Sequence, residues 1–262
     1  MKKNIKKEKR QAHIFESLKK IGKQDKILII NPEMISYKNH LEIKKFTDKY
    51  ICYLYDSLYR NPASRLQEIF DKIFSFDEND VKNHGFQHLD NYIYSEKMPL
   101  QKNRKSNYSV YTISSVDERL PLLNAIAHEL DRLKITYKFI LHDKKEPKNI
   151  HPAIEFTKKR LSLEEVKKMQ ADSEVILDLI RPHQKGLSFR IFEALALQKK
   201  IITSNVAIKK YKFYNPSNIL IVDAEKPNID LDFFKTNFVP VPDEIYNLYT
   251  LDTWTDRVFD LK

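Results

Sequence analysis

The chain has 262 residues, of which 42% are hydrophobic and 31% are charged, and its net charge is +10. This composition is typical of a globular protein with a real core and excludes a disordered chain. The longest apolar runs have five to seven residues, whereas a transmembrane helix needs roughly 20. Cys52 is the only cysteine, which excludes a disulfide and a cysteine metal site.

Positive charge is concentrated at the start of the chain, where residues 1–26 hold ten Lys or Arg and three acidic residues. Residues 1–25 are predicted to form a basic amphipathic helix, with Ile14, Leu18 and Ile21 on its apolar face. This helix is either a solvated surface element or a contact with anionic lipid head groups at the inner face of the plasma membrane. A nucleic-acid partner is not expected, because the rest of the chain is nearly balanced in charge. No apolar segment follows the basic start, so we predict no signal peptide and a cytoplasmic location.

The first half of the chain alternates between strand and helix patterns. Such alternation predicts a parallel sheet with crossover helices. Strands are predicted at 26–31, 50–56 and 72–77, with helical stretches between them, including 63–71. The polar and basic stretch 98–108 has no apolar period and marks a domain boundary. Residues 26–104 are therefore predicted to be an N-terminal α/β domain.

The second half starts the same pattern again and predicts a second domain over residues 105–240. Its predicted strands are 108–114, 137–142, 174–180, 199–205 and 218–223, and its clearest helices are 117–134 and a helix that begins at 163. The last segment, 241–262, is predicted to be a helix that packs across. The expected fold is α/β, with two Rossmann-like domains in tandem. Ligands on such sheets bind at the carboxyl ends of the strands, so we expect a site in the cleft between the domains.

The stretch HQKGLSFRIFEAL, residues 183–195, joins the predicted strand 174–180 to a helix. A loop with a glycine before a helix N-terminus is an anion site, because Gly186 carries no Cβ and the helix dipole favours negative charge. Lys185 and Arg190 suit a diphosphate, Ser188 can cap the helix or donate to a phosphate, and Glu193 suits a ribose diol. The alternative is ordinary packing, with Arg190 and Glu193 as a surface ion pair.

Two further strand ends are polar. The residues at these ends are Ser114, Ser115 and Arg119 after one strand, and Thr203 and Asn205 after another. Together with the glycine loop they favour a nucleotide pocket.

Candidate catalytic residues lie in the first half of the chain. Asp56 follows the second strand and is the candidate general base for an acceptor hydroxyl, with Asp77 as the reserve. The alternative for either residue is a turn or N-cap aspartate. The histidines show no metal-ligand spacing, so we predict no catalytic metal.

Residues 161–205 resemble the donor half of GT-B glycosyltransferases, in particular bacterial enzymes of lipopolysaccharide and capsule synthesis. The shared signature is Q-x-G-L-[ST]-x-R-x-x-E-A-L followed by K-K-x-I-T-[TS]-N. It is carried here by Gln184, Gly186, Leu187, Ser188, Arg190, Glu193 and Asn205. Residues 53–61, 70–86 and 211–223 resemble the same family more weakly, and the resemblance extends over roughly 26–258.

The resemblance implies a transferase that moves a sugar from a nucleotide-sugar donor, UDP- or GDP-linked, to a cell-surface glycan acceptor, with no further cofactor. By position, Glu193 would bind the donor's ribose, and the Gly186–Ser188 turn and Arg190 would bind its diphosphate. The serines and arginine of 114–119 would line the donor side, and His183 could approach a phosphate.

The sequence departs from the family pattern in two places. Lys185 stands where retaining members often carry the first glutamate of a Glu-x7-Glu pair, so the stereochemical outcome stays open. The N-terminal domain begins without the usual strand and glycine loop and looks short by at least one β-α unit. Two alternatives therefore stay open: a nucleotide-sugar epimerase on the same fold, and a shortened, non-catalytic relative that binds nucleotide or a partner.

Overall fold

The structure is a computed structural model that describes residues 2–63, 65–100 and 106–261. These residues form two compact units. Unit 1 comprises the described parts of 1–91, 184–186 and 254–262, and unit 2 comprises those of 92–183 and 187–253. Two short segments from late in the chain thus complete unit 1. Among the described residues, no helix has the length and apolar character needed to cross a bilayer.

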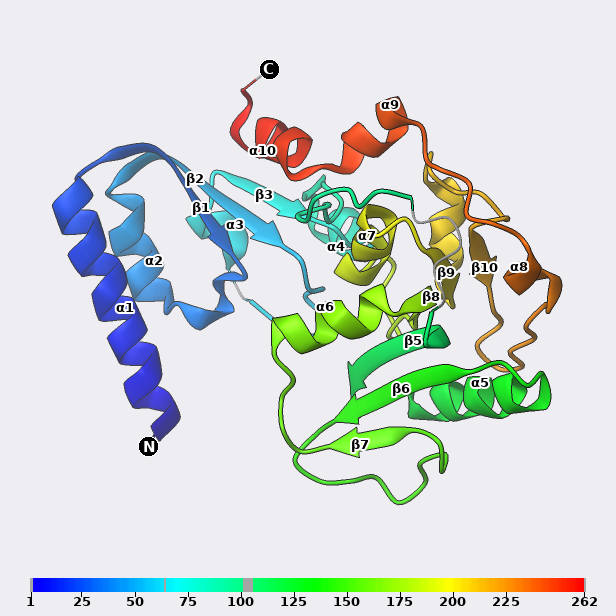
Figure 1. The fold of residues 1–262 in the computed structure, drawn as a ribbon. Coiled ribbons are helices and arrows are strands. Elements are labelled where there is room, and N and C mark those ends of the chain that lie inside the picture. The colour runs from blue at the N-terminus through cyan, green and yellow to red at the C-terminus, as the bar shows by residue number, and fades with distance from the viewer. Residues whose placement is uncertain (1, 64, 101–105, 262) are drawn as a thin grey trace. The chain divides into compact units, whose positions relative to one another are not determined.

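Unit 1 contains a four-stranded parallel sheet in the order β1-β2-β3-β4 (Figure 1). Each parallel neighbour requires a crossover connection, and helical segments supply it. The elements are α1 (Lys2–Ile21), β1 (Gln24–Ile30), η1 (Pro32–Met34), α2 (Tyr37–Lys44), β2 (Thr47–Leu54), α3 (Leu66–Ile69), β3 (Lys72–Ser75), α4 (Glu78–His84) and β4 (Gln87–His88).

The N-terminal helix α1 is built into the core of unit 1. Ile14 and Phe15 pack against this core, and Leu18 is buried in it. Gly22, at φ +74°, ends the helix and donates its N–H to the Leu18 carbonyl at 2.9 Å. The predicted helix is confirmed, except that Ile21 lies outside the buried face and is 60% exposed.

An aromatic contact and an ionic cluster help to hold the C-terminal segment of unit 1 to its sheet. Trp254 meets Tyr53 edge-on, with ring centroids 4.9 Å apart. Asp260 receives hydrogen bonds from Lys49 at 2.8 Å and Lys72 at 2.7 Å. These two hydrogen bonds lower the pKa of Asp260 to about 2.

Unit 2 contains a six-stranded parallel sheet in the order β10-β9-β8-β5-β6-β7. Its elements are β5 (Tyr108–Ser115), α5 (Leu120–Arg132), β6 (Tyr137–His142), β7 (Glu155–Thr157), α6 (Leu163–Ala171), β8 (Ser173–Asp178), α7 (Phe189–Ala196), β9 (Lys200–Thr203), η2 (Val206–Lys210), β10 (Ile219–Ile221), α8 (Asp232–Lys235), α9 (Asp243–Tyr246), η3 (Asn247–Tyr249) and α10 (Leu251–Phe259), whose last residues enter unit 1.

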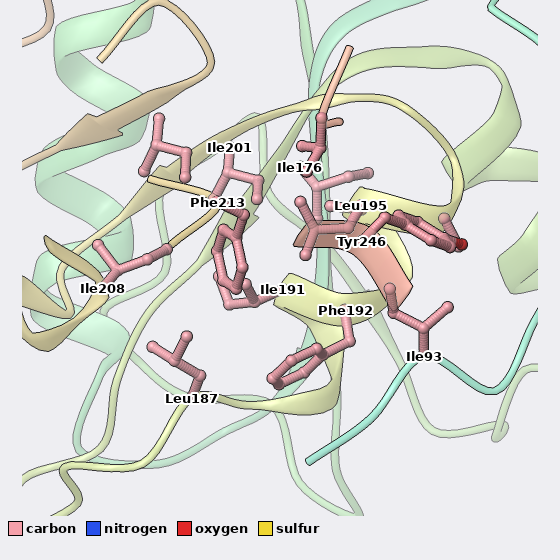
Figure 2. Close-up of a cluster of buried hydrophobic side chains, with 14 of the residues drawn as sticks. Ile93, Ile176, Leu187, Ile191, Phe192, Leu195, Ile201, Ile208, Phe213 and Tyr246 are labelled. Carbon is pink, nitrogen blue, oxygen red and sulfur yellow. The ribbon is translucent and has the colours of Figure 1, made fainter. Parts of the chain in front are cut away.

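Helices cover both faces of the unit 2 sheet, as the near-continuous apolar run of β8 predicts. Ile176 packs with the α7 residues Ile191 and Leu195 on one face (Figure 2). Its neighbours Val175 and Leu177 pack with α5 on the other face. The alternation follows from the two-residue period of a strand.

The strand order of unit 2 creates a topological switch point. The chain runs outward from β5 through β6 to β7, then returns to place β8 on the other side of β5 and continues to β9 and β10. The connections that leave β5 and β8 therefore diverge at the carboxyl edge of the sheet. Open α/β sheets bind ligands in the crevice at this place.

Candidate functional site

A cluster of arginines and carboxylates lies at the switch point of unit 2. Arg119, after β5, donates from Nε to Asp117 Oδ1 at 2.8 Å, from Nη2 to Asp117 Oδ2 at 2.6 Å, and from Nη1 to the Leu179 carbonyl at 3.0 Å. Arg181 Nε reaches the same Asp117 carboxylate at 3.2 Å. Burial raises the pKa of Asp117, but the hydrogen bonds from Arg119 and the positive charges of Arg119 and Arg181 together outweigh it, so the pKa is lowered. Both arginines are thus held in fixed positions at this edge.

A third arginine joins the cluster from the first turn of α7. Arg190 Nη1 lies 3.7 Å from Asp178 Oδ1, and its Nη2 donates to the Ile113 carbonyl. The Asp178 carboxylate is buried and also accepts from Ser188 Oγ at 2.7 Å and Thr203 Oγ1 at 3.4 Å. Asp178 therefore fixes α7 and β9 relative to β8.

A small pocket opens beside these side chains. Its wall includes Ser114, Ser115, Asp117, Arg119 and Arg190. The arginine cluster, defined as Arg119, Arg181 and Arg190, carries three positive charges, and Asp117 and Asp178 offset two of them. Such a site suits a compact anion with several oxygen atoms.

Glu193 does not pair with Arg190, so the surface ion pair considered from the sequence is absent. Its Oε1 accepts from the Tyr94 hydroxyl, and its Oε2 accepts from Gln170 Nε2 at 2.9 Å. Burial raises the pKa of Tyr94, and the hydrogen bond to Glu193 raises it further. The carboxylate is half-buried and fixed by two neutral donors.

The glycine loop 184–186 belongs to unit 1, where it meets Asp77. Asp77 Oδ2 accepts from the main-chain nitrogens of Lys185 at 2.6 Å and Gly186 at 3.3 Å, and its Oδ1 accepts from Asn79 N at 2.9 Å. Asp77 is completely buried, so no carboxylate oxygen reaches the surface here. The structure places this reserve general base as an N-cap of α4 and an anchor for the loop.

Gly186 has a steric reason to be glycine. A Cβ at this position would lie 2.4 Å from both the ring and the carbonyl oxygen of Phe76. Contacts this short do not occur for real Cβ atoms, so a side chain would force the backbone to move. The glycine that the sequence associated with a phosphate is required by packing inside unit 1.

Asp56 lies in a different environment from Asp77. It is half-buried at the carboxyl end of β2, in the wall of a pocket of about 500 Å³ that it shares with Tyr55 and Asn61. Its Oδ2 accepts from Asn61 Nδ2 at 3.1 Å, and Arg60 lies 3.8 Å from its Oδ1. Asp56 can therefore meet a ligand in that pocket.

The remaining predicted residues fall into two groups. Ser188 begins α7, Leu187 is buried in the core, and Thr203 and Asn205 are buried at the end of β9, where Asn205 Oδ1 accepts from Ala207 N at 3.0 Å. His183 and Lys185 carry exposed side chains, and Gln184 Nε2 donates to the Gly186 carbonyl at 3.2 Å. The roles of these residues in ligand binding stay predictions.

Sequence reasoning missed Asp117, Asp178 and Arg181. Asp178 had a visible signal, since it is the one charged residue inside the apolar run VILDLI. For Asp117 and Arg181, the only signal in the sequence was that each residue follows a predicted strand. Within 2–63, 65–100 and 106–261, no three His, Cys, Asp or Glu side chains are arranged to hold a metal ion.

The comparisons with known proteins give a fold. No family model and no curated protein matches the sequence. Solved structures match over nearly the whole chain, although sequence identity is low. One is the apo form of the lipopolysaccharide outer core galactosyltransferase WaaB, with 10% identity and a TM-score of 0.50 over 99% of this chain and 82% of that one.

Two further structures are more similar by TM-score. An alpha-glucosyltransferase in complex with UDP and a 13-mer DNA containing an HMU base has 12% identity and a TM-score of 0.58, over 95% of this chain and 78% of that one. AviGT4, a glycosyltransferase involved in avilamycin A biosynthesis, has 11% identity and a TM-score of 0.58, over 94% of this chain and 75% of that one. The chain thus has the GT-B fold, and the predicted fold class is confirmed.

Proposed function

We propose that the chain is a glycosyltransferase and that unit 2 binds the diphosphate of its nucleotide-sugar donor at the switch point of the sheet. The observation that carries this proposal is the arginine cluster at the edge where β5 and β8 diverge. The similarity to solved glycosyltransferases supports it. UDP is the first nucleotide to test, because one of these structures holds it.

The cluster is organised before any ligand arrives. Asp117 holds Arg119 and Arg181, while Asp178 and the Ile113 carbonyl hold Arg190. Positive charge fixed in this way stabilises a developing anion without reorganising at the moment of reaction. Ser114 and Ser115 line the same pocket, and a serine hydroxyl can supply a neutral donor.

The proposed reaction exchanges one bond at the donor sugar for another. The bond from the anomeric carbon to the diphosphate oxygen breaks, and the electron pair stays with the departing nucleoside diphosphate. The acceptor oxygen bonds to the anomeric carbon, and its proton passes to a base. Asp56 is the proposed base, because its half-buried carboxylate lines a pocket, whereas Asp77 is completely buried.

The acceptor is proposed to be a cell-surface glycan, a lipopolysaccharide or capsule precursor. The donor-half signature supports this class, and the similarity in fold to a lipopolysaccharide galactosyltransferase agrees with it. Glu193 is proposed to accept hydrogen bonds from the donor's ribose, with Gln170 and Tyr94 fixing its carboxylate. We propose a reaction without a catalytic metal, in which the arginines supply the positive charge that stabilises the departing diphosphate.

The basic helix α1 is proposed to hold the protein on the cytoplasmic surface of a membrane. Its apolar residues Ile14, Phe15 and Leu18 are used in the core of unit 1. The proposed contact with the lipid is therefore mainly electrostatic, and each Lys or Arg near an anionic surface contributes about 1 kcal/mol. The expected association is peripheral and sensitive to salt.

Nucleotide binding tests the donor site directly. UDP, GDP and CMP are titrated in a thermal-unfolding assay against the wild type, Arg190→Met and the control Arg132→Met, which changes an exposed arginine of the same unit. A bound nucleotide raises the melting temperature with the logarithm of its concentration. We expect UDP to stabilise the wild type and the control, and to bind Arg190→Met at least tenfold more weakly.

The outcomes separate the alternatives. If no nucleotide binds, or if Arg190→Met binds it as the wild type does, the donor site is not at the arginine cluster. Conversion of a UDP-sugar to its stereoisomer without an acceptor would favour an epimerase. Binding with neither transfer nor hydrolysis of UDP- or GDP-sugars would favour a non-catalytic nucleotide-binding protein.

A further inference from the structure

Unit 2 has a second pocket, at the edge of the sheet opposite the arginine cluster. It lies where β8 and β9 begin, at Ser173 and Lys200, and its volume is about 780 Å³. Small-molecule sites fall in the range of roughly 300–1,000 Å³. The pocket is thus large enough for an organic ligand and is separate from the proposed donor site.

A buried lysine stands in the wall of this pocket. Lys200 is 6% exposed, and its ammonium group donates to the Phe233 carbonyl and to Thr236 Oγ1, the latter at 2.6 Å. It also lies 4.5 Å from the centre of the Phe233 ring. All of these partners are neutral. An ammonium group has three protons, and the described part of the chain gives the third one no acceptor.

Burial of this charge is unfavourable. Burial lowers the pKa of Lys200, and the nearby Glu174 only partly opposes that effect. A buried charge without a charged partner destabilises the fold unless something offsets its loss of hydration. An anion that accepts the third proton would supply that compensation.

The other lining residues define what kind of anion fits. Lys199 adds a second cation, whose ammonium group donates to the carbonyls of Ala171 and Ser173. Glu174 is the acidic residue among those that line the pocket. The apolar part of the wall is contributed by Met98, Pro99, Leu100, Val175, Leu197, Phe234, Phe238 and Pro240.

We propose that this pocket binds a small organic anion with an apolar body. Its carboxylate or phosphate oxygen accepts from Lys200, and its alkyl or aryl part packs against Phe234 and Phe238. The inference does not rest on the glycosyltransferase proposal, because it uses different residues at the opposite edge of the sheet.

The test is isothermal titration of the full chain with four probes. Octyl phosphate and octanoate carry both features of the ligand, inorganic phosphate lacks the apolar body, and octanol lacks the charge. We expect at least one amphiphilic anion to bind at least tenfold more tightly than inorganic phosphate and octanol. The better of the two identifies the anionic group.

Variants assign the binding to this pocket. Lys200→Met keeps the apolar stem without the charge and is expected to weaken amphiphile binding at least tenfold. Lys145→Met, which changes an exposed lysine of the same unit, is expected to bind like the wild type. Equal affinity in the wild type and Lys200→Met, or no binding of either amphiphile, overturns the proposal.

A second variant keeps the test decisive if Lys200→Met does not fold. Phe238→Ala shortens the apolar wall at a half-buried position. We expect it to weaken binding of the amphiphilic anion at least fivefold. Unchanged affinity in Phe238→Ala would contradict the proposed placement of the apolar body.

Discussion

Asp77 Oδ2 lies 2.6 Å from the main-chain nitrogen of Lys185, and it also accepts from Gly186 N at 3.3 Å. The two main-chain N–H groups that the sequence motif predicted to bind a phosphate therefore donate to a carboxylate of the protein. The loop before α7 is fixed by the protein itself. A donor diphosphate at unit 2 would depend on the arginine cluster more than on the main chain of this loop.

Replacing Asp77 should destabilise the protein strongly. Asp77→Ala removes a carboxylate that accepts from three N–H groups, two of them in the loop. Hydrogen bonds to charged groups contribute about 1.5–3 kcal/mol each, so we expect the loss of three to lower the free energy of unfolding by roughly 4 kcal/mol or more. Urea denaturation measures it, with Glu78→Gln at the next, exposed position as the control. A loss no larger than that of the control would refute the anchoring role.

A methyl group at Gly186 should be costly for a steric reason. In Gly186→Ala the new Cβ meets the ring and carbonyl of Phe76 at 2.4 Å, and overpacking of this kind costs roughly 1–3 kcal/mol. Gly22→Ala is the comparison: open space surrounds its Cβ, and only its φ of +74° is unfavourable. We expect Gly186→Ala to lower the melting temperature more than Gly22→Ala. The reverse order would show that the contact with Phe76 relaxes easily.

Glu193 should recognise the ribose of the donor. The wild type is expected to bind UDP about tenfold more tightly than 2′,3′-dideoxy-UDP, because a carboxylate accepts from both hydroxyls. A tenfold difference in affinity corresponds to about 1.4 kcal/mol of binding free energy. Glu193→Ala should bind the two nucleotides equally. If calorimetry shows that the variant still prefers UDP, another group recognises the ribose.

The ionic cluster of Asp260 should make stability dependent on acidic pH. The pKa of Asp260 is about 2 in the folded protein because Lys49 and Lys72 donate to it, below the ordinary value of 3.8. A depressed carboxyl pKa gives stability that is present above the unfolded-state value and lost as pH falls through the folded-state value. The wild type should thus exceed Asp260→Asn in stability at pH 6, and the difference should shrink between about pH 4 and pH 2. A difference independent of pH would mean that the variant acts through packing.

Charge reversal on α1 should weaken membrane binding. Lys9, Lys19 and Lys20 are exposed, and changing all three to Glu replaces attraction to anionic lipid by repulsion. We expect at least tenfold weaker sedimentation with phosphatidylserine vesicles and little change with phosphatidylcholine. The matched control changes Lys144, Lys145 and Lys148, which are exposed on a loop of unit 2. An equal loss in the control would assign the effect to net charge alone.

The fold could be predicted from the sequence because its strongest patterns are local. The apolar run of β8 and the amphipathic α5 identified a doubly covered parallel sheet. The helix predicted to begin at 163 is α6, and a capping box of Ser162 and Glu165 begins it. The short strands β4 and β7 were missed, since two or three residues give no measurable period. The helix predicted at 63–71 is only the four-residue α3.

The candidate site was harder to predict because its partners are distant in sequence. The motif around Gly186 was visible, but the carboxylate that binds its main chain is more than 100 residues earlier. Likewise, Arg190 and Glu193 have the spacing of a helical ion pair, yet each binds residues from other elements. Spacing indicates which side chains share a helix face; the tertiary fold decides which partners they meet.

The discontinuity of unit 1 has a consequence for biosynthesis. Residues 254–262 belong with the first 91 residues, so Trp254 and Asp260 reach Tyr53, Lys49 and Lys72 only after all of unit 2 has been translated. During synthesis, the sheet of unit 1 therefore lacks its contacts with residues 254–262 until unit 2 has been translated. Deletion of residues 254–262 would therefore damage unit 1, although most of that unit lies at the other end of the sequence.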